Sequence, residues 1–397
     1  MRPALEAIFW IAVAPIAWTQ VGYALFIGLL ARVFGAGDVA SASAARGTGK
    51  ARQDHPPDPS VSLIVAAHEE ERVIGGKVAN ALALHYPREL LQVIVACDGC
   101  EDATAARART AGADLVLELP RGGKIAAQNA AVERARGEIV AFSDANALWA
   151  PEALRELVAA FADARVGYAC GRVRFVRDAQ ATDGEDATNQ EGVYWSYEMA
   201  LRARESRLCS ITAGNGAIYA TRRESYIVVD PVMGHDLSFP FNMVKRGWRA
   251  VEAPAARATE KMVPSIEGEW RRKRRMMSHT WPIVVRGGML SPRGYPPGYA
   301  LMILSHRVLR YLLPFLHALA LACNAAVVVL GAGTVYLVTL ALQLALLFAA
   351  ALARVAPARP LLIARYYVLT AASPAAGLWD WLRHGTEASW QAAEGTR

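Results

Sequence analysis

A long apolar run near the N-terminus constrains the fold of this chain more than any other feature. Residues 8–33 are almost wholly apolar, and roughly 20 such residues suffice to cross the hydrocarbon core of a membrane. No convincing cleavage site follows, which argues against a signal peptide. Only Arg2 precedes the run, whereas basic residues follow it between positions 46 and 52. Because basic flanks stay in the cytoplasm, we predict a transmembrane helix in residues 1–34 and a cytoplasmic domain after it.

Two more apolar runs lie near the C-terminus, at residues 311–330 and 334–353, with a short glycine turn between them. Basic residues flank the pair on its outer sides, so both flanks are expected in the cytoplasm. Residues 361–382 are also apolar, but charged residues and a proline interrupt them, and their Tyr and Trp side chains suit a membrane interface. We therefore expect residues 291–397 to combine two spans with an interfacial or re-entrant segment.

The composition agrees with a membrane protein. Hydrophobic residues make up 54% of the 397 residues, and their excess is concentrated at the two ends. A formal net charge of +7 is compatible with nucleic acid, anionic lipid or a phosphate-bearing substrate, and the apolar ends favour a membrane. Cys97 and Cys100 form a CxxC pair without a second pair or a His cluster. A zinc site is therefore not indicated, and we expect reduced thiols.

The middle of the chain has the pattern of an α/β domain. Residues 35–60 are rich in Gly, Ala, Ser, Asp and Pro and indicate a flexible linker. In residues 61–290, short apolar runs first alternate with amphipathic helices, which we place at 69–84, 101–111 and 124–135. Continuous apolar strands between helices are typical of a parallel sheet covered on both faces. The expected strands are VSLIVAA, LQVIVAC, DLVLEL and EIVAFSD.

Polar residues follow each of these strands directly. In sheets of this kind, ligands bind beyond the carboxyl ends of the strands, so these residues are the candidates for a site. A purely structural set of loops would rarely place acids, amides, glycines and a lysine at every turn. The four groups are His68-Glu69-Glu70, Asp98-Gly99, Arg121-Gly122-Gly123-Lys124 and Asp144-Ala145-Asn146.

These motifs give the chain a specific resemblance. The middle of the chain resembles the family 2 membrane glycosyltransferases, the group of the cellulose, hyaluronan and poly-N-acetylglucosamine synthases. The resemblance implies a GT-A (Rossmann-like) fold, a UDP-type donor, a divalent metal (Mg²⁺ or Mn²⁺) and inversion at the anomeric carbon. The similar stretches are VSLIVAAHEEE, VIVACDGCEDAT, GGKIAAQNAAVERARGEIVAFSDAN, TAGNGAIYATRRE, GHDLSFPFNMVKRGWRA and EWRRKRRMM.

The resemblance places the nucleotide-sugar donor on Ala67, Glu70, Asp98, Lys124 and Asp144. Asp98 can accept a hydrogen bond from a pyrimidine ring, although an Asx turn is the alternative. Glu70 corresponds to an acid that approaches the ribose, or it is only an acid at a helix start. Lys124, beside the N–H groups of a helix start, suits a diphosphate.

The same resemblance places a divalent metal at Asp144 and Asn146. Two carboxylates spaced by one residue would hold the ion that neutralises the leaving diphosphate. Here the second acid is replaced by Asn146, a neutral ligand. We therefore expect weaker metal binding or a further ligand from elsewhere, with Asp144 as the main ligand.

Asp236 takes the place of the catalytic base, which accepts a proton from the acceptor hydroxyl. The alternative is a helix N-cap, and His235 replaces the acid that precedes the base in the family. Residues 212–216, TAGNG, resemble the acceptor-side loop. In the basic helix that follows, Arg272 and Arg275 correspond to arginines that bind the departing diphosphate, or they form a patch for anionic lipid.

The sequence thus predicts an inverting hexosyltransferase with a cytoplasmic catalytic domain in the plasma membrane, acting in polysaccharide or exopolysaccharide synthesis. Its expected partners are a nucleotide sugar, a glycan or lipid-linked acceptor and membrane lipids, with an export partner as a further candidate, but not nucleic acid. Met276, where processive relatives have Trp, favours an alternative: addition of one sugar to a polyprenyl-phosphate or other lipid carrier. A non-enzymatic membrane protein that binds anionic lipid or nucleic acid would leave the acids at the strand ends unexplained.

Overall fold

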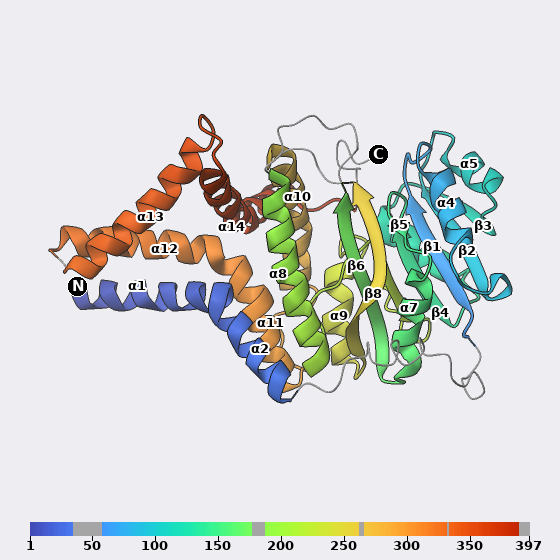
Figure 1. The fold of residues 1–397 in the computed structure, drawn as a ribbon, viewed down its shortest axis with the longest axis horizontal. Helices are drawn as coiled ribbons and strands as arrows, with labels where there is room; N and C mark the ends of the chain where they lie inside the picture. The colour runs from blue at the N-terminus through green and yellow to red at the C-terminus, as the bar shows by residue number, and fades with distance from the viewer. Residues whose placement is uncertain (35–57, 177–186, 262–265, 332, 389–397) are drawn as a thin grey trace.

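The computed structural model describes residues 1–34, 58–176, 187–261, 266–331 and 333–388. Most of the expected linker, residues 35–57, lies outside the described residues. Figure 1 shows two regions: an α/β domain around a twisted sheet, and a group of long helices that projects from one side of it.

The sheet has eight strands in the order β3-β2-β1-β4-β7-β6-β8-β5. The first four are parallel, with Val61 paired to both Leu91 and Ile139, as the alternation of strands and helices predicted. β7 then reverses the direction against β4 and β6, and β8 runs parallel to β6. The bounds are β1 (Val61–Ala67), β2 (Leu91–Asp98), β3 (Leu115–Leu119), β4 (Ile139–Asp144), β5 (Leu148–Trp149), β6 (Val166–Val176), β7 (Ile218–Arg222) and β8 (Arg249–Lys261).

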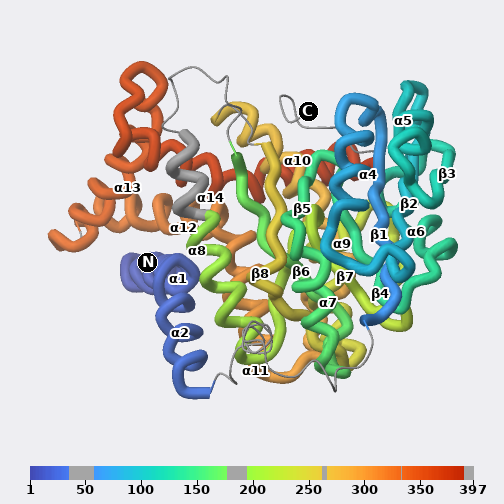
Figure 2. The backbone as a smooth tube through the Cα atoms, turned by 45° about the vertical axis from the view of Figure 1, so that its right-hand side comes forward, coloured from blue at the N-terminus to red at the C-terminus, as the bar shows by residue number. Residues whose placement is uncertain are grey.

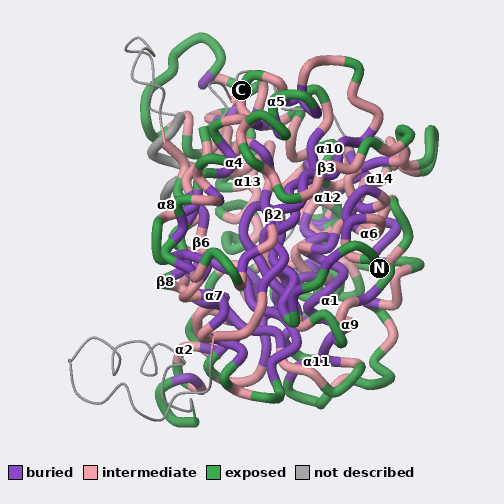
Figure 3. The backbone as a smooth tube through the Cα atoms, turned by 90° about the vertical axis from the view of Figure 1, so that its right-hand side faces the viewer, coloured by how far each residue is buried: buried purple, intermediate pink, exposed green. Residues whose placement is uncertain are grey.

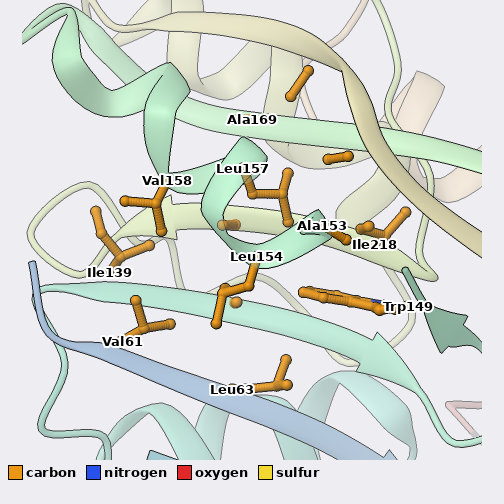
Figure 4. Packing of buried hydrophobic residues seen from close by; sticks show 14 of the residues in the cluster. Val61, Leu63, Ile139, Trp149, Ala153, Leu154, Leu157, Val158, Ala169 and Ile218 are labelled. Carbon is orange, nitrogen blue, oxygen red and sulfur yellow. The ribbon is translucent and has the colours of Figure 1, made fainter. Parts of the chain in front are cut away.

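Helices cover both faces of the sheet. The side chains of β1 alternate between the two faces: Leu63 packs in the cluster that contains α7 (Ala153–Ala159), and Ile64 packs in the cluster that contains α6 (Lys124–Val132) and α9 (His235–Lys245). Figure 4 shows α7 lying on the strands with Leu154 and Leu157 pointing into them. Burying each such leucine contributes roughly 1.5–3 kcal/mol. In Figure 3 the buried strands accordingly run through the centre of the molecule.

The helix after β1 begins later than the pattern predicted, because the residues before it form a fixed turn. α4 spans Ile74–Leu82, whereas residue 69 was the expected start. Glu69 has a positive φ of 53°, and its carboxylate accepts a hydrogen bond from the backbone N–H of Glu101 at 2.8 Å. The loop that follows β1 is thus tied to the loop that follows β2, ahead of α5 (Thr104–Thr110).

Four helical stretches within the described ranges are long and apolar enough to cross a membrane: Arg2–Val33, Pro297–Val329, Thr334–Leu352 and Arg359–His384. The first contains α1 (Arg2–Ala17) and α2 (Tyr23–Val33), and the second contains α11 (Pro297–Ile303) and α12 (Leu309–Val329). α13 (Thr334–Leu352) and α14 (Arg359–His384) are the other two. α13 exposes Leu and Phe side chains such as Leu342 and Phe348, as a helix in contact with lipid does.

The first two stretches are bent rather than straight. A π-helical turn (Trp18–Gly22) separates α1 from α2, and another (Leu304–Val308) separates α11 from α12. The two turns meet where Trp18 Nε1 donates to Ser305 Oγ at 2.9 Å. α1 packs on α12, whereas α2 packs on α8 (Ala187–Leu208) of the α/β domain. The bend between α1 and α2 is plain in Figure 2, so the apolar run at residues 8–33 is not one straight span.

α14 has the length and composition of a span, yet it packs along α10 (Ile266–Val285), the helix that carries the basic run. Arg274 makes two hydrogen bonds of 2.6 Å to Asp380 of α14, and Trp281 Nε1 donates to Pro374 O at 2.8 Å. Contacts between charged groups favour the interfacial position that the sequence predicted for residues 361–382. That position stays a prediction.

Candidate active site

The carboxyl ends of the parallel strands bring together residues that lie far apart in the sequence. Asp144 ends β4 and forms an ion pair with Lys124, the first residue of α6. Lys124 Nζ also lies close to Gly216: a Cβ added to this glycine would be 3.3 Å from it. The expected diphosphate lysine, the expected metal ligand and the glycine loop before β7 therefore form one site.

Asp98 organises the loop that precedes Lys124. Its buried carboxylate accepts hydrogen bonds from Arg121 Nη1 at 2.9 Å, from Gly122 N at 2.7 Å and from Gly123 N at 2.9 Å. Gly123 has a φ of +92°, a backbone conformation that favours glycine. Asp98 thus has a clear structural task in this loop, and its contact with a nucleobase stays a prediction.

Ala67 ends β1 and Glu70 follows it, and both contact the segment that follows β2. Ala67 is buried and pairs with Cys97 in the parallel ladder. Glu70 is also buried, and its backbone N–H donates to Thr104 Oγ1 at 2.8 Å. His68 Nδ1 lies 2.8 Å from Asp98 O and joins the two loops. The structure therefore places Ala67 beside the end of β2 and ties Glu70 to the start of α5, and their contacts with a donor stay predictions.

The residues at the end of β4 fit a divalent cation that is also held by the phosphates of a donor. Asp144 and Asn146 are both half-buried, and Mg²⁺ is commonly bound by one or two carboxylates together with substrate phosphates. Among the described residues, no group of three His, Cys, Asp or Glu side chains could hold a metal on its own. The neutral amide of Asn146 and the ion pair between Lys124 and Asp144 are both expected to weaken the binding of a cation without a donor, and the metal site stays a prediction.

Lys77 is a buried cation close to this site that the sequence analysis missed. Its Nζ donates to Ala147 O at 2.7 Å and lies 5.1 Å from the centre of the Trp149 ring. Burial lowers the pKa of Lys77 to about 7, against the opposing effect of Asp144. A lysine on an amphipathic helix normally faces solvent, and the sequence contains no signal that this one points inward.

Asp236 lies at the start of α9 but is not its N-cap, because Gly234 holds that position. The backbone carbonyl of Asp236 accepts a hydrogen bond from Gly214 N at 2.7 Å. This bond fixes Asp236 against the loop at residues 212–216, which the sequence predicted on the acceptor side. Asp236 is half-buried, and a negative charge in the first turn of a helix is favourable.

His235 points away from Asp236 into the core. Its ring is buried, stacks on Phe239 at 4.1 Å and has Nδ1 2.7 Å from the hydroxyl of Tyr219. Burial and then the positive charge of Lys124 lower the pKa of His235 well below its usual value. His235 is therefore a neutral histidine of the core and a poor candidate for the base.

Tyr219 is a buried tyrosine near the two acids of the site. It lies in β7, opposite Phe142 of β4. Burial raises its pKa well above the usual value, and the negative charges of Asp144 and Asp236 add to that effect. One buried ring thus lies close enough to both carboxylates to respond to their charge.

The loop at residues 212–216 needs a glycine at position 214 for a steric reason. A Cβ at Gly214 would overlap the hydroxyl of Tyr168. Asn215 fixes the other half of the loop, since Nδ2 donates to Gly171 O at 2.6 Å and Oδ1 accepts from Ile218 N at 2.9 Å. Asn215 therefore has a structural role, and the backbone of the loop faces Asp236.

Arg272 and Arg275 belong to α10, which packs against α9 and α14. Arg272 makes two hydrogen bonds, at 2.7 and 2.8 Å, to the carboxylate of Glu269 on the same helix. Arg275 is exposed. Lys273 donates to Tyr366 OH of α14 at 2.8 Å, so part of the basic run holds α14. The roles of Arg272 and Arg275 toward a diphosphate stay predictions.

Comparison with known proteins identifies related molecules. Residues 56–278 match the family model described as "Glycosyltransferase like family 2". The chain is similar to the mannosyltransferase PcManGT from Pyrobaculum calidifontis in complex with GDP-Man and Mn²⁺, with 25% identity and a TM-score of 0.63 over 96% of this chain and 99% of that chain.

Two further solved structures are more distant. Mannosyl-3-phosphoglycerate synthase from Rubrobacter xylanophilus has 18% identity and a TM-score of 0.40, with 63% of this chain and 77% of that chain covered. Glucosyl-3-phosphoglycerate synthase from Mycobacterium tuberculosis has 17% identity and a TM-score of 0.39, with 65% and 85% covered. None of the curated proteins compared matches the sequence.

Proposed function

The chain belongs to the glycosyltransferase family 2-like proteins, and from that premise we propose that it moves a hexose from a nucleotide-diphosphate donor to a glycan or lipid-linked acceptor at a membrane. Its fold is the GT-A fold that the resemblance implied, and it is a glycosyltransferase that uses a nucleotide sugar. The proposal depends most on one observation, the convergence of Lys124, Asp144 and Asp236 on residues 212–216.

Each polar residue of the site has a task in the proposed reaction. Asp144 and Asn146 would hold a divalent ion, which neutralises the charge of the diphosphate when it is bound. Lys124 donates a charge-assisted hydrogen bond to a diphosphate oxygen. Asp236 accepts the proton of the acceptor hydroxyl as that oxygen bonds to the anomeric carbon and the bond to the diphosphate breaks.

Donors with either of two nucleotides, UDP or GDP, need to be tested. The resemblance of the motifs implies a UDP-sugar, whereas the solved mannosyltransferase holds GDP-Man and Mn²⁺. The base is expected near Asp98 and Arg121, which bind each other, and this pair does not by itself distinguish uracil from guanine. We therefore keep UDP-glucose, UDP-N-acetylglucosamine and GDP-mannose as candidates.

We place the reaction at the cytoplasmic face of the plasma membrane. The support is the basic flank after the first apolar run and the exposed apolar surface of α13. A role in polysaccharide or exopolysaccharide synthesis, with a possible export partner, follows from the synthase-like motifs. Met276 in place of Trp favours the second candidate, transfer of one sugar to a polyprenyl-phosphate or other lipid carrier.

The test is turnover of nucleotide sugars by the full chain purified in detergent. Release of UDP or GDP is measured for the three candidate donors with Mn²⁺, with Mg²⁺ and with EDTA, and with a membrane lipid extract as acceptor source. We expect one donor to be consumed faster than the others, in a metal-dependent manner. Equal background release from all three, with or without metal, would contradict the proposal.

A further inference from the structure

A cluster of buried charged residues lies where the long helices meet the α/β domain. We call Glu198, Glu205, His306, Arg307 and Arg310 the junction cluster. Glu198 and Glu205 belong to α8, and the other three follow α11. His306 Nδ1 lies 2.6 Å from Glu205 and Nε2 lies 3.2 Å from Glu198. Arg307 and Arg310 donate to Glu198 at 3.0 and 2.6 Å.

Charges in this cluster need an explanation beyond stability. All five side chains are less than about one seventh exposed, and buried ion pairs are often no more stabilising than apolar residues of the same size. Burial raises the pKa of Glu198, but His306, Arg307 and Arg310 together hold it well below its usual value. Burial also raises the pKa of Glu205, but His306, Arg307 and the hydrogen bond from Tyr23 together hold it below its usual value, so both carboxylates are charged. Such clusters are most useful where they fix one geometry.

The geometry that the junction cluster fixes is that of the acceptor-side loop. Glu205 accepts hydrogen bonds from Thr212 N at 3.1 Å and from Thr212 Oγ1 at 3.0 Å. Arg307 Nε donates to the same hydroxyl at 2.9 Å. Two residues further on, Gly214 N donates to the carbonyl of Asp236 at 2.7 Å. Residues 212–214 thus link the buried carboxylate of Glu205 to the backbone of Asp236, the proposed base.

The junction cluster also holds the first helix pair. Tyr23, the first residue of α2, donates its hydroxyl to Glu205 at 2.6 Å. Tyr23 follows one π-helical turn, and His306 and Arg307 lie within the other. Turns of this kind occur frequently at functional sites. Glu205 therefore receives hydrogen bonds from the acceptor-side loop, from α2 and from the bent helix after α11.

We propose that Glu205 is a positioning residue: it fixes residues 212–214, and through them Asp236, to the two helices that enter the membrane. This inference rests on the proposed role of Asp236. If Glu205 has this role, α2 and α12 are part of the catalytic apparatus. A shift of either helix would move residues 212–214, and with them Asp236, relative to the acceptor.

The experiment measures backbone hydrogen exchange in residues 211–216 and release of the nucleotide from the donor that the wild type prefers. Thr212→Val is nearly isosteric, removes the hydroxyl and leaves Glu205 and Arg307 each without one partner. We expect exchange in this loop to rise by about tenfold and turnover to fall by about tenfold or more, with the donor KM within about twofold. Thr212→Ser, which keeps the hydroxyl, should restore both.

Two more variants test the link to the helices. Tyr23→Phe removes only the hydrogen bond from α2, and we expect a change of the same sign as in Thr212→Val but smaller. Glu205→Gln should resemble Thr212→Val. The control is Glu118→Gln, which breaks the ion pair between Glu118 and Arg109 at β3, the edge strand that β2, β1 and β4 separate from β7. It should leave the loop exchange unchanged.

Wild-type exchange in Thr212→Val, or a Thr212→Ser variant as impaired as Thr212→Val, would overturn the positioning role. Wild-type exchange and turnover in Tyr23→Phe would overturn the link to the helices. If no nucleotide sugar is turned over by the wild type, the proposed function fails, and the exchange data still decide whether Glu205 fixes the loop.

Discussion

Replacing Lys124 with Gln should change the affinities for metal and for donor in opposite directions. In the structure, Lys124 is paired with Asp144, and each side chain is about one fifth exposed. A metal ion that binds Asp144 must break this pair. A partly exposed ion pair contributes at most about 1 kcal/mol, which corresponds to about fivefold in an equilibrium constant. Lys124→Gln should therefore bind Mn²⁺ alone more tightly, by up to about fivefold.

The same change should weaken donor binding, because glutamine cannot replace a charged donor to the diphosphate. Hydrogen bonds to charged groups are worth about 1.5–3 kcal/mol, so the donor Kd at saturating Mn²⁺ should rise by about 10- to 100-fold. Free Mn²⁺ is measured by electron paramagnetic resonance and donor binding by calorimetry. The matched control is Lys245→Gln, whose lysine donates to Gly288 O at 2.5 Å at the other end of α9 and should leave both affinities unchanged. If both affinities of Lys124→Gln move in the same direction, the assignment of Lys124 is wrong.

Three further outcomes are expected. Asp144→Ala should lose metal-dependent donor binding in calorimetry and turnover at every Mg²⁺ or Mn²⁺ concentration; a variant as active as the wild type would remove Asp144 from the metal site. Folded Lys77 has a pKa of about 7 instead of 10.5, so the unfolded chain binds the extra proton between these values. The free energy of unfolding of the wild type should therefore rise relative to that of Lys77→Met from pH 7 to pH 9, by up to ~1.4 kcal/mol per pH unit. The difference in Tm between the two proteins follows this change, and parallel pH profiles of Tm would contradict it. Finally, protease should cut residues 35–60 in inside-out but not in right-side-out vesicles, and the reverse pattern would invert the topology.

The sequence predicted the parallel strands and the polar loops at their carboxyl ends best, because both have a local pattern. β1 to β4 and the positions of Lys124 and Asp144 beyond the strand ends could be predicted because each apolar strand leads directly into its polar loop. The reversal at β7 could not, because nothing in its five residues distinguishes a parallel from an antiparallel neighbour.

Contacts between residues that are far apart in the sequence could not be predicted either. Glu205 and His306 are separated by 101 positions, and neither has a motif around it. A partial signal was present, since His306, Arg307 and Arg310 interrupt an otherwise apolar stretch, and charged residues in such a stretch often mark a functional site. The direction of the His235 side chain was equally hidden, because only its contacts with Tyr219 and Phe239 show that it faces the core.

The most direct test of the account compares Asp236→Asn with the wild type, by measuring donor affinity and sugar transfer on the same preparation. Asn keeps the shape of the side chain, and the N-cap of α9 is Gly234, so folding and donor Kd should be nearly unchanged. Without a group that accepts the proton, transfer should fall by about 10²–10⁴-fold. Wild-type transfer by Asp236→Asn would show that the base lies elsewhere and that the site does not work as proposed.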